Sequence, residues 1–104
     1  VKPAQVTVLG GGIVGTEAAR MAIGMGAQVT ILDVNVDRLS YLESIFGSRI
    51  ELLYSNSSHI QEIVPNTDLL IGAVLITGRK APTLVSRELV KQMRSGSVIV
   101  DVAV

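Results

Sequence analysis

The sequence of 104 residues contains no cysteine, no tryptophan, one phenylalanine and two tyrosines. Without cysteine, the chain can form neither a disulfide framework nor a zinc–thiolate site, and we expect no metal centre. The absence also fits a reducing compartment, so a cytoplasmic protein is expected. Because 48% of the residues are nevertheless hydrophobic, the core must consist of Val, Ile, Leu and Ala. This composition is typical of a buried parallel sheet covered by helices.

An excess of charge of one sign is also missing, because nine Lys and Arg residues balance nine Asp and Glu residues. No basic cluster indicates a nucleic-acid partner. No apolar run reaches the roughly 18 residues that a membrane-spanning helix needs, so no membrane contact is expected. The first residues, from Val1, resemble no targeting peptide and include no initiator Met. We therefore expect a piece of a longer chain.

Strand and helix patterns alternate along the whole sequence. Short apolar, β-branched runs predict strands at Gln5–Leu9, Gln28–Leu32, Ile50–Tyr54, Asp68–Val74 and Ser97–Val104. The intervening segments predict helices at Gly12–Met25, Asn35–Phe46, Ser57–Val64 and Ser86–Met93. Asn35 is expected to cap the second helix, and Pro65 is expected to stop the third. Strands joined by helices imply right-handed crossovers, and therefore one α/β domain with a doubly wound parallel sheet of five or more strands in the order 3-2-1-4-5.

A glycine motif, G-x-G-x-x-G, follows the first predicted strand and opens the first helix. In this position each glycine has a physical task. Gly10 permits the tight turn, Gly12 lets a pyrophosphate approach the backbone, and Gly15 lets the helix pack closely against the sheet. The helix N-terminus then offers free N–H groups and partial positive charge to the phosphates. The motif predicts a Rossmann dinucleotide site, whereas the alternative is a glycine-rich turn without a ligand.

Asp33 supplies the second signal, because it ends the second predicted strand about 20 residues after the glycines. A carboxylate at this point accepts hydrogen bonds from the adenosine ribose hydroxyls and repels a 2′-phosphate. The next residues, Val34 and Asn35, provide no arginine for such a phosphate. The sequence therefore favours NAD over NADP. In the alternative interpretation Asp33 only caps the following helix, although the two roles are compatible.

Five segments together resemble the NAD-binding domain of alanine dehydrogenases, whose family includes nicotinamide nucleotide transhydrogenase. The resemblance covers essentially the whole chain and is carried by Val8–Ala19, Ile31–Leu39, Leu70–Ile76, Gly78–Pro82 and Val98–Val104. It implies an NAD(H)-binding domain over residues 1–104, within a two-domain enzyme that interconverts L-alanine with pyruvate and ammonia. It also implies that the catalytic groups lie outside this sequence, and that the partners are a substrate domain and further subunits of a homo-oligomer, a hexamer.

The resemblance further implies which residues contact the cofactor. Ile13 and Val14 would lie under the pyrophosphate, with Arg38 near the adenosine end and Ser55 beside the adenine. The remaining contacts would follow the path to the nicotinamide ribose and the nicotinamide, and comprise Val74, Leu75, Val102, Ala103 and Val104.

Ordinary structural roles compete with these assignments. Arg38 could be a solvated surface residue and Ser55 a turn residue. Four of the apolar contacts could be ordinary core residues: Val74, Leu75, Val102 and Val104. His59, which has no second ligand or nucleophile near it in the sequence, is interpreted as a surface histidine. Two other functions also stay open for the whole chain: the NAD-binding component of a proton-pumping transhydrogenase, and a nucleotide-sensing regulatory domain.

Overall fold

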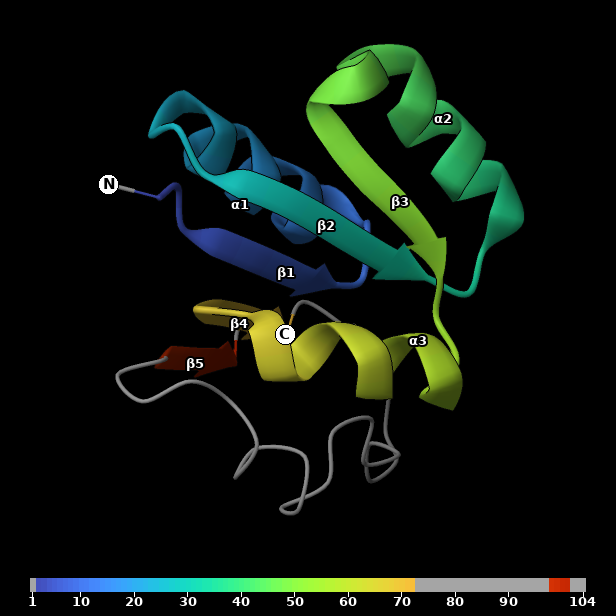
Figure 1. The fold of residues 1–104 in the computed structure, drawn as a ribbon. Coiled ribbons are helices and arrows are strands. Elements are labelled where there is room, and N and C mark those ends of the chain that lie inside the picture. Colours follow the sequence, from blue (N-terminus) through green and yellow to red (C-terminus); the bar gives the residue numbers. More distant parts are fainter. Residues whose placement is uncertain (1, 73–97, 102–104) are drawn as a thin grey trace.

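The computed structural model describes residues 2–72 and 98–101. Within these ranges five parallel strands form one sheet in the order β3-β2-β1-β4-β5, which confirms the predicted topology (Figure 1). The strands are β1 (Gln5–Leu9), β2 (Gln28–Asp33), β3 (Ile50–Tyr54), β4 (Leu69–Gly72) and β5 (Val98–Asp101). The chain therefore runs outward from β1 to β3 on one side, and then crosses back to build β4 and β5 on the other.

Side-chain alternation along the strands divides the core into two layers, one on each face of the sheet. Helices α1 (Ile13–Gly24) and α2 (Val36–Phe46) lie against one face, with a cluster that includes Val6, Val8, Ala19, Ile31, Leu42 and Phe46. Helix α3 (Ser57–Ile63) lies against the other face, with the cluster of Leu9, Leu32, Ile60, Val64 and Leu70. Helices on both faces make the sheet doubly wound.

The small-residue side of α1 explains how closely this helix approaches the sheet. Its buried residues are Gly15, Ala19 and Ala22, which recur at helical spacing and bring the helix backbone near the strands. Helix α2 instead inserts larger side chains, Leu42 and Phe46, into the same layer. The two helices thus fix the positions of the segments that lead into and out of β2.

Several element ends differ by a few residues from the sequence prediction. Helix α1 begins at Ile13 and ends at Gly24, so Gly12 and Met25 are its caps rather than its ends. Helix α3 ends at Ile63, and the Val64 N–H makes its last bond, to the Ile60 carbonyl. Pro65 stops the α-helix as predicted, but it lies inside a 3₁₀ turn, Val64–Asn66. The physical reason is that proline lacks the N–H needed to continue the α-helical ladder, yet its fixed φ suits one tighter turn. Asn35 caps α2 as predicted, since its Oδ1 accepts a hydrogen bond from the Arg38 N–H at 3.1 Å.

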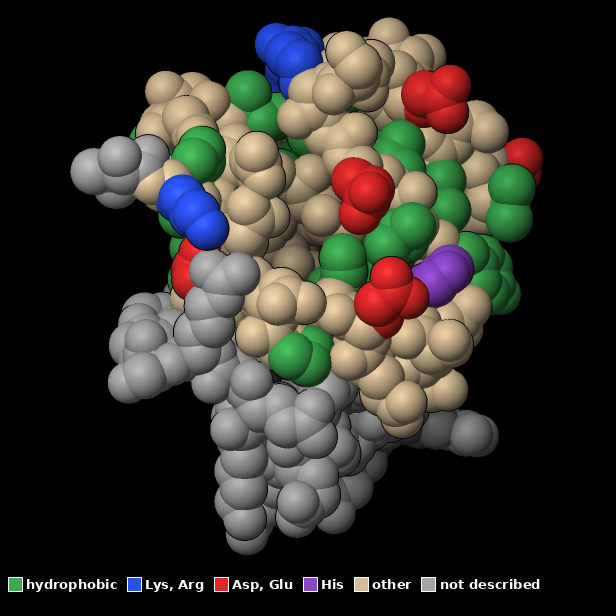
Figure 2. All heavy atoms as spheres, in the orientation of Figure 1, with side chains coloured by type: hydrophobic (Ala, Val, Ile, Leu, Met, Phe, Trp, Pro, Cys, Tyr) green, Lys and Arg blue, Asp and Glu red, His purple; other side chains and the backbone are tan. Residues whose placement is uncertain are grey.

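The predicted helix Ser86–Met93 and the outer ends of the last two predicted strands lie outside the described residues. Among the described residues, no helix is both long and apolar enough to cross a bilayer. Figure 2 shows one face of the molecule, on which acidic, basic and hydrophobic side chains are interspersed. The described part of this face therefore presents no large patch of a single charge.

Candidate functional site

The glycine loop connects β1 to α1 at the carboxyl edge of the sheet, the edge where folds of this type bind ligands. Gly10 begins the turn with a φ of 106°, a left-handed conformation that favours glycine. Its N–H donates to the carbonyl of Leu32 at 2.7 Å, so the loop is tied to the end of β2. The turn that the sequence predicts at Gly10 is therefore present.

Gly15 and Gly12 differ in what a side chain would meet. A Cβ on Gly15 would lie 1.9 Å from the carbonyl oxygen of Gly10, so no residue with a side chain fits between helix and loop. A Cβ on Gly12 would meet nothing closer than Arg38 Nη1 at 4.0 Å. Gly15 thus serves internal packing, whereas the space beside Gly12 is open to an approaching group.

The first turn of α1 faces the same open space. Gly12 is the N-cap and provides no side-chain hydrogen bond to the helix N–H groups, which have no intrahelical acceptors at a helix start. Two apolar residues of this turn are exposed: Ile13 by 86% and Val14 by 37%. Their exposure separates them from the core, and it leaves them available to a ligand bound over the loop.

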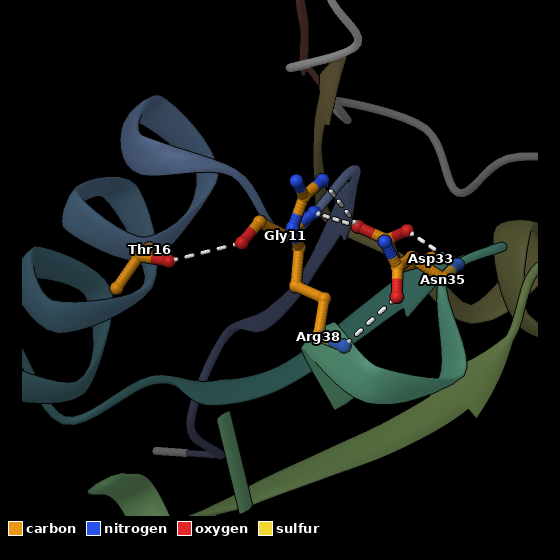
Figure 3. Close-up of polar contacts among 5 residues, drawn as sticks. All are labelled: Gly11, Thr16, Asp33, Asn35 and Arg38. Atoms are coloured by element: carbon orange, nitrogen blue, oxygen red, sulfur yellow. Dashed lines mark hydrogen bonds and ion pairs between the residues drawn. The ribbon is translucent and has the colours of Figure 1, made fainter. Parts of the chain in front are cut away.

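Asp33 is buried at the end of β2, with only 6% of its surface exposed. Its Oδ2 accepts a hydrogen bond from the Gly11 N–H at 2.7 Å, and its Oδ1 accepts one from the Asn35 N–H at 2.8 Å (Figure 3). The carboxylate therefore joins the glycine loop to the turn that precedes α2. It is not the cap of α2, because that position belongs to Asn35.

Arg38 requires a correction to the sequence analysis, which found no arginine at Val34 or Asn35 to stand beside Asp33 and placed Arg38 only in general terms, near the adenosine end. The guanidinium of Arg38 folds back from the first turn of α2, and its Nη1 lies 3.5 Å from Asp33 Oδ2 (Figure 3). Spacing along the chain hid this contact, because residues 33 and 38 are separated by the turn that begins the helix. The Arg38 side chain is still 45% exposed, so it can also contact solvent or a ligand.

Ser55 follows β3 and joins the same edge of the sheet. Its N–H donates to the carbonyl of Asp33 at 2.9 Å, which holds the start of the β3–α3 connection next to β2. His59 lies in α3, half-buried, with its Nδ1 2.6 Å from the carbonyl of Tyr54. That contact gives the histidine a local structural role, and makes it less of a free surface residue than the sequence suggests.

Gly11 is a residue that the sequence analysis passed over. It is buried, and its N–H is one of the two backbone donors to Asp33. The available signal was the run of three consecutive glycines, because the G-x-G-x-x-G motif requires only the first and third of them. The middle glycine therefore needed an explanation of its own.

The described site combines N–H donors, one carboxylate and one guanidinium within the same few ångströms. Such a set can bind phosphate oxygens at the helix start and a diol at the carboxylate. Among the residues that the structure describes, no three potential metal-ligating side chains come together. The remaining predicted contacts lie outside the described residues: Val74, Leu75, Val102, Ala103 and Val104.

Comparison with known protein families gives one match over the whole chain. Residues 1–104 match the model of the family "Alanine dehydrogenase/PNT, C-terminal domain". The chain is 62% identical to the alanine dehydrogenase of Methanococcus maripaludis and 60% identical to that of Bacillus subtilis, in each case over 104 residues. It spans 28% of the length of each of these relatives.

Two solved structures are similar to this chain to different degrees. An L-alanine dehydrogenase structure is 69% identical, with a TM-score of 0.95, over 98% of this chain and 28% of that one. A transhydrogenase from Sinorhizobium meliloti is 31% identical, with a TM-score of 0.84, over 95% of this chain and 28% of that one. Alanine dehydrogenases are thus much more similar in sequence than the transhydrogenase.

Proposed function

Because the chain belongs to the family of alanine dehydrogenase/PNT C-terminal domains, we propose that residues 1–104 are the NAD(H)-binding domain of an L-alanine dehydrogenase. The observation that carries this proposal is the buried carboxylate of Asp33, held beside the glycine loop by the Gly11 N–H at 2.7 Å. A fixed carboxylate at this point suits a ribose diol. The high identity to alanine dehydrogenases supports the choice of parent enzyme.

The residues present fit a dinucleotide. The open space beside Gly12 suits a pyrophosphate, because a Cβ there would have no neighbour nearer than 4.0 Å. The N–H groups at the start of α1 would bind its oxygens, with Ile13 and Val14 beneath it. Asp33 would accept from the ribose hydroxyls, with Arg38 alongside and Ser55 toward the adenine. We include in this site the five residues outside the described ranges, Val74, Leu75, Val102, Ala103 and Val104, as its nicotinamide end.

The proposed whole enzyme converts L-alanine, NAD⁺ and water into pyruvate, ammonium, NADH and a proton. The bound dinucleotide supplies the hydride acceptor, and this domain binds and orients it. The chain spans 28% of its alanine dehydrogenase relatives, which supports a separate substrate domain in the rest of the enzyme. We therefore assign the acid–base groups to that other part, since a general acid or base must reach the substrate directly.

Two measurements test this function. The full-length protein is expected to form NADH from NAD⁺ only when L-alanine is present, as followed by the absorbance of NADH. The 104-residue chain alone is expected to bind NADH without any turnover of alanine. Alanine oxidation by the isolated chain, above a control without enzyme, contradicts the assignment of the catalytic groups to the other domain.

The transhydrogenase structure supports a second candidate, because it shares the fold at a TM-score of 0.84. A transhydrogenase component would pass a hydride between two nicotinamide dinucleotides and would not consume alanine. The difference between 31% and 69% identity favours alanine dehydrogenase. Alanine-independent hydride exchange between NADH and an NADP analogue would reverse this preference.

We also propose that the parent enzyme is a cytoplasmic homo-oligomer. The absence of cysteine suits a reducing compartment. Met21 on α1 and Met25, which caps its C-terminus, are 70% and 85% exposed, which supports burial against another part of the enzyme or another subunit. Light scattering on the full-length protein is expected to give a multiple of the subunit mass, and a fluorescent fusion is expected to fill the cytoplasm.

A further inference from the structure

Gly11 packs more tightly than its position in the motif requires. A Cβ at this residue would lie 2.6 Å from Leu42 Cδ1 and 3.2 Å from Asp33 Oδ2. Leu42 is fully buried between α2 and the sheet, so its side chain has little room to move away. Gly11 has no positive φ, which means that the constraint on this residue is space rather than backbone conformation.

The peptide groups of Gly11 are held from both sides (Figure 3). Its N–H donates to Asp33 Oδ2 at 2.7 Å, and its carbonyl accepts from Thr16 Oγ1 at 3.2 Å. The first bond is buried, where a charge-assisted hydrogen bond is strong and geometrically restrictive. The backbone of the glycine loop therefore positions the carboxylate of Asp33. The Leu42 side chain of α2 occupies the space beside Gly11 that a Cβ would need.

We propose that Gly11 is a positioning residue that sets cofactor selectivity through Asp33. Because it lacks a side chain, the loop backbone comes close enough to fix Oδ2 where it accepts from an unphosphorylated ribose. Any Cβ pushes the carboxylate outward and breaks this placement. The inference rests on the proposed binding of NAD(H), and it adds a residue whose effect is on the choice between NADH and NADPH.

The displaced carboxylate affects the two cofactors differently. NADH loses hydrogen bonds from its ribose diol to a fixed acceptor. NADPH keeps only the 3′-hydroxyl of this diol, so it has fewer such bonds to lose. The repulsion between its 2′-phosphate and the Asp33 carboxylate also falls when the carboxylate moves away. A change at Gly11 is thus expected to reduce the ratio of the two affinities, whereas general damage to the loop would weaken both cofactors equally.

The test uses fluorescence titrations of NADH and NADPH with the full-length protein and four variants. Gly11→Ala adds the Cβ. Gly11→Ala combined with Leu42→Val removes the Leu42 Cδ atoms, so that the 2.6 Å overlap is relieved while the approach of 3.2 Å to Asp33 stays. Leu42→Val alone controls for the packing change. Gly12→Ala is the matched control, because it adds a Cβ one residue away that does not approach Asp33.

Gly11→Ala is expected to lower the NADH/NADPH affinity ratio by about fivefold or more, the net effect of losing one buried hydrogen bond. The double variant is expected to show the same loss, which keeps the test available if Gly11→Ala alone fails to fold. Leu42→Val is expected to keep the wild-type ratio, and Gly12→Ala to weaken both cofactors by similar factors. A wild-type ratio in the double variant overturns the proposal, since the effect would then run through Leu42 packing.

Wild-type titrations separate this inference from the proposed function. If the wild-type protein binds neither cofactor, the proposed dinucleotide site itself is wrong. If it prefers NADH and both Gly11 variants keep the wild-type ratio of the two affinities, only the role of Gly11 is wrong.

Discussion

The guanidinium of Arg38 and the carboxylate of Asp33 lie 3.5 Å apart at the carboxyl end of β2. The pair combines a buried anion, 5% exposed at its side chain, with a cation that is 45% exposed. In the proposed site, an acceptor for ribose hydroxyls and a donor suited to phosphate would therefore share one position. Arg38 would there partly offset the repulsion that Asp33 exerts on a 2′-phosphate.

Replacing Arg38 with glutamine is accordingly expected to weaken NADPH binding by about threefold, because a partly exposed cation contributes modestly to binding. NADH binding is expected to change by less than about twofold, since the ribose diol carries no charge. Titration of both cofactors checks this result. Arg20→Gln, whose guanidinium pairs with Glu17 at 3.6 Å on α1, serves as the control and is expected to change neither affinity. Stronger NADPH binding by Arg38→Gln is the contrary outcome.

Two glycines of α1 are expected to respond in opposite ways to alanine. Gly15→Ala places a Cβ 1.9 Å from the Gly10 carbonyl oxygen, so the free energy of unfolding is expected to fall by about 3 kcal/mol or more. Gly24→Ala meets nothing within 4 Å and is expected to raise the free energy of unfolding by about 0.5–1 kcal/mol, because alanine restricts the unfolded chain. Urea denaturation measures both. Equal changes in the free energy of unfolding would contradict the close approach of α1 to the glycine loop at Gly15.

A buried pair of hydroxyls links β1 to the start of β4, where Thr7 Oγ1 and Thr67 Oγ1 are 2.7 Å apart. The Thr67 hydroxyl donates to the Ile63 carbonyl at 2.9 Å, so its proton is used there and Thr7 donates to Thr67. Thr7→Val keeps the bond from Thr67 to the Ile63 carbonyl, and is expected to lower the free energy of unfolding by about 1 kcal/mol. Thr67→Val leaves the buried Thr7 hydroxyl without this acceptor, and is expected to lower it by about 2 kcal/mol.

The asymmetry between these two threonines can be measured by chemical denaturation of both variants. Thr30→Val on β2, whose threonine is half-buried, controls for the general effect of exchanging threonine for valine in a strand. A larger loss of unfolding free energy for Thr7→Val than for Thr67→Val would contradict the assignment of Thr7 as the donor.

The order of the strands was predictable because it depends on patterns that the chain repeats: short β-branched runs, helical segments between them and right-handed crossovers. Boundaries were less predictable. At Pro65, for example, the missing N–H ends the α-helix but permits a 3₁₀ turn, and the choice depends on local packing that the sequence does not display.

The candidate site also has a part that the sequence predicts and a part that it does not. The positions of Gly10, Gly15 and Asp33 follow from the motif, because strand, turn and helix leave them few arrangements. The contact between Arg38 and Asp33, and the constraint on Gly11, depend on how α2 docks on the sheet and where Leu42 points. Docking of this kind is a tertiary property, so sequence spacing alone could not reveal either of them.

The central claim, a site that selects NADH through Asp33, is tested most directly by the ratio of NADPH to NADH dissociation constants for the wild-type protein and Asp33→Ala. Two charge-assisted bonds to the ribose and repulsion of the 2′-phosphate act in the same direction, so the wild-type ratio is expected to be at least about 10, or 1.4 kcal/mol. Asp33→Ala is expected to weaken NADH binding and narrow the ratio, since Arg38 then faces the phosphate unopposed. Equal wild-type affinities, or an unchanged ratio in Asp33→Ala, would contradict the account and leave Asp33 as a structural link between the glycine loop and α2.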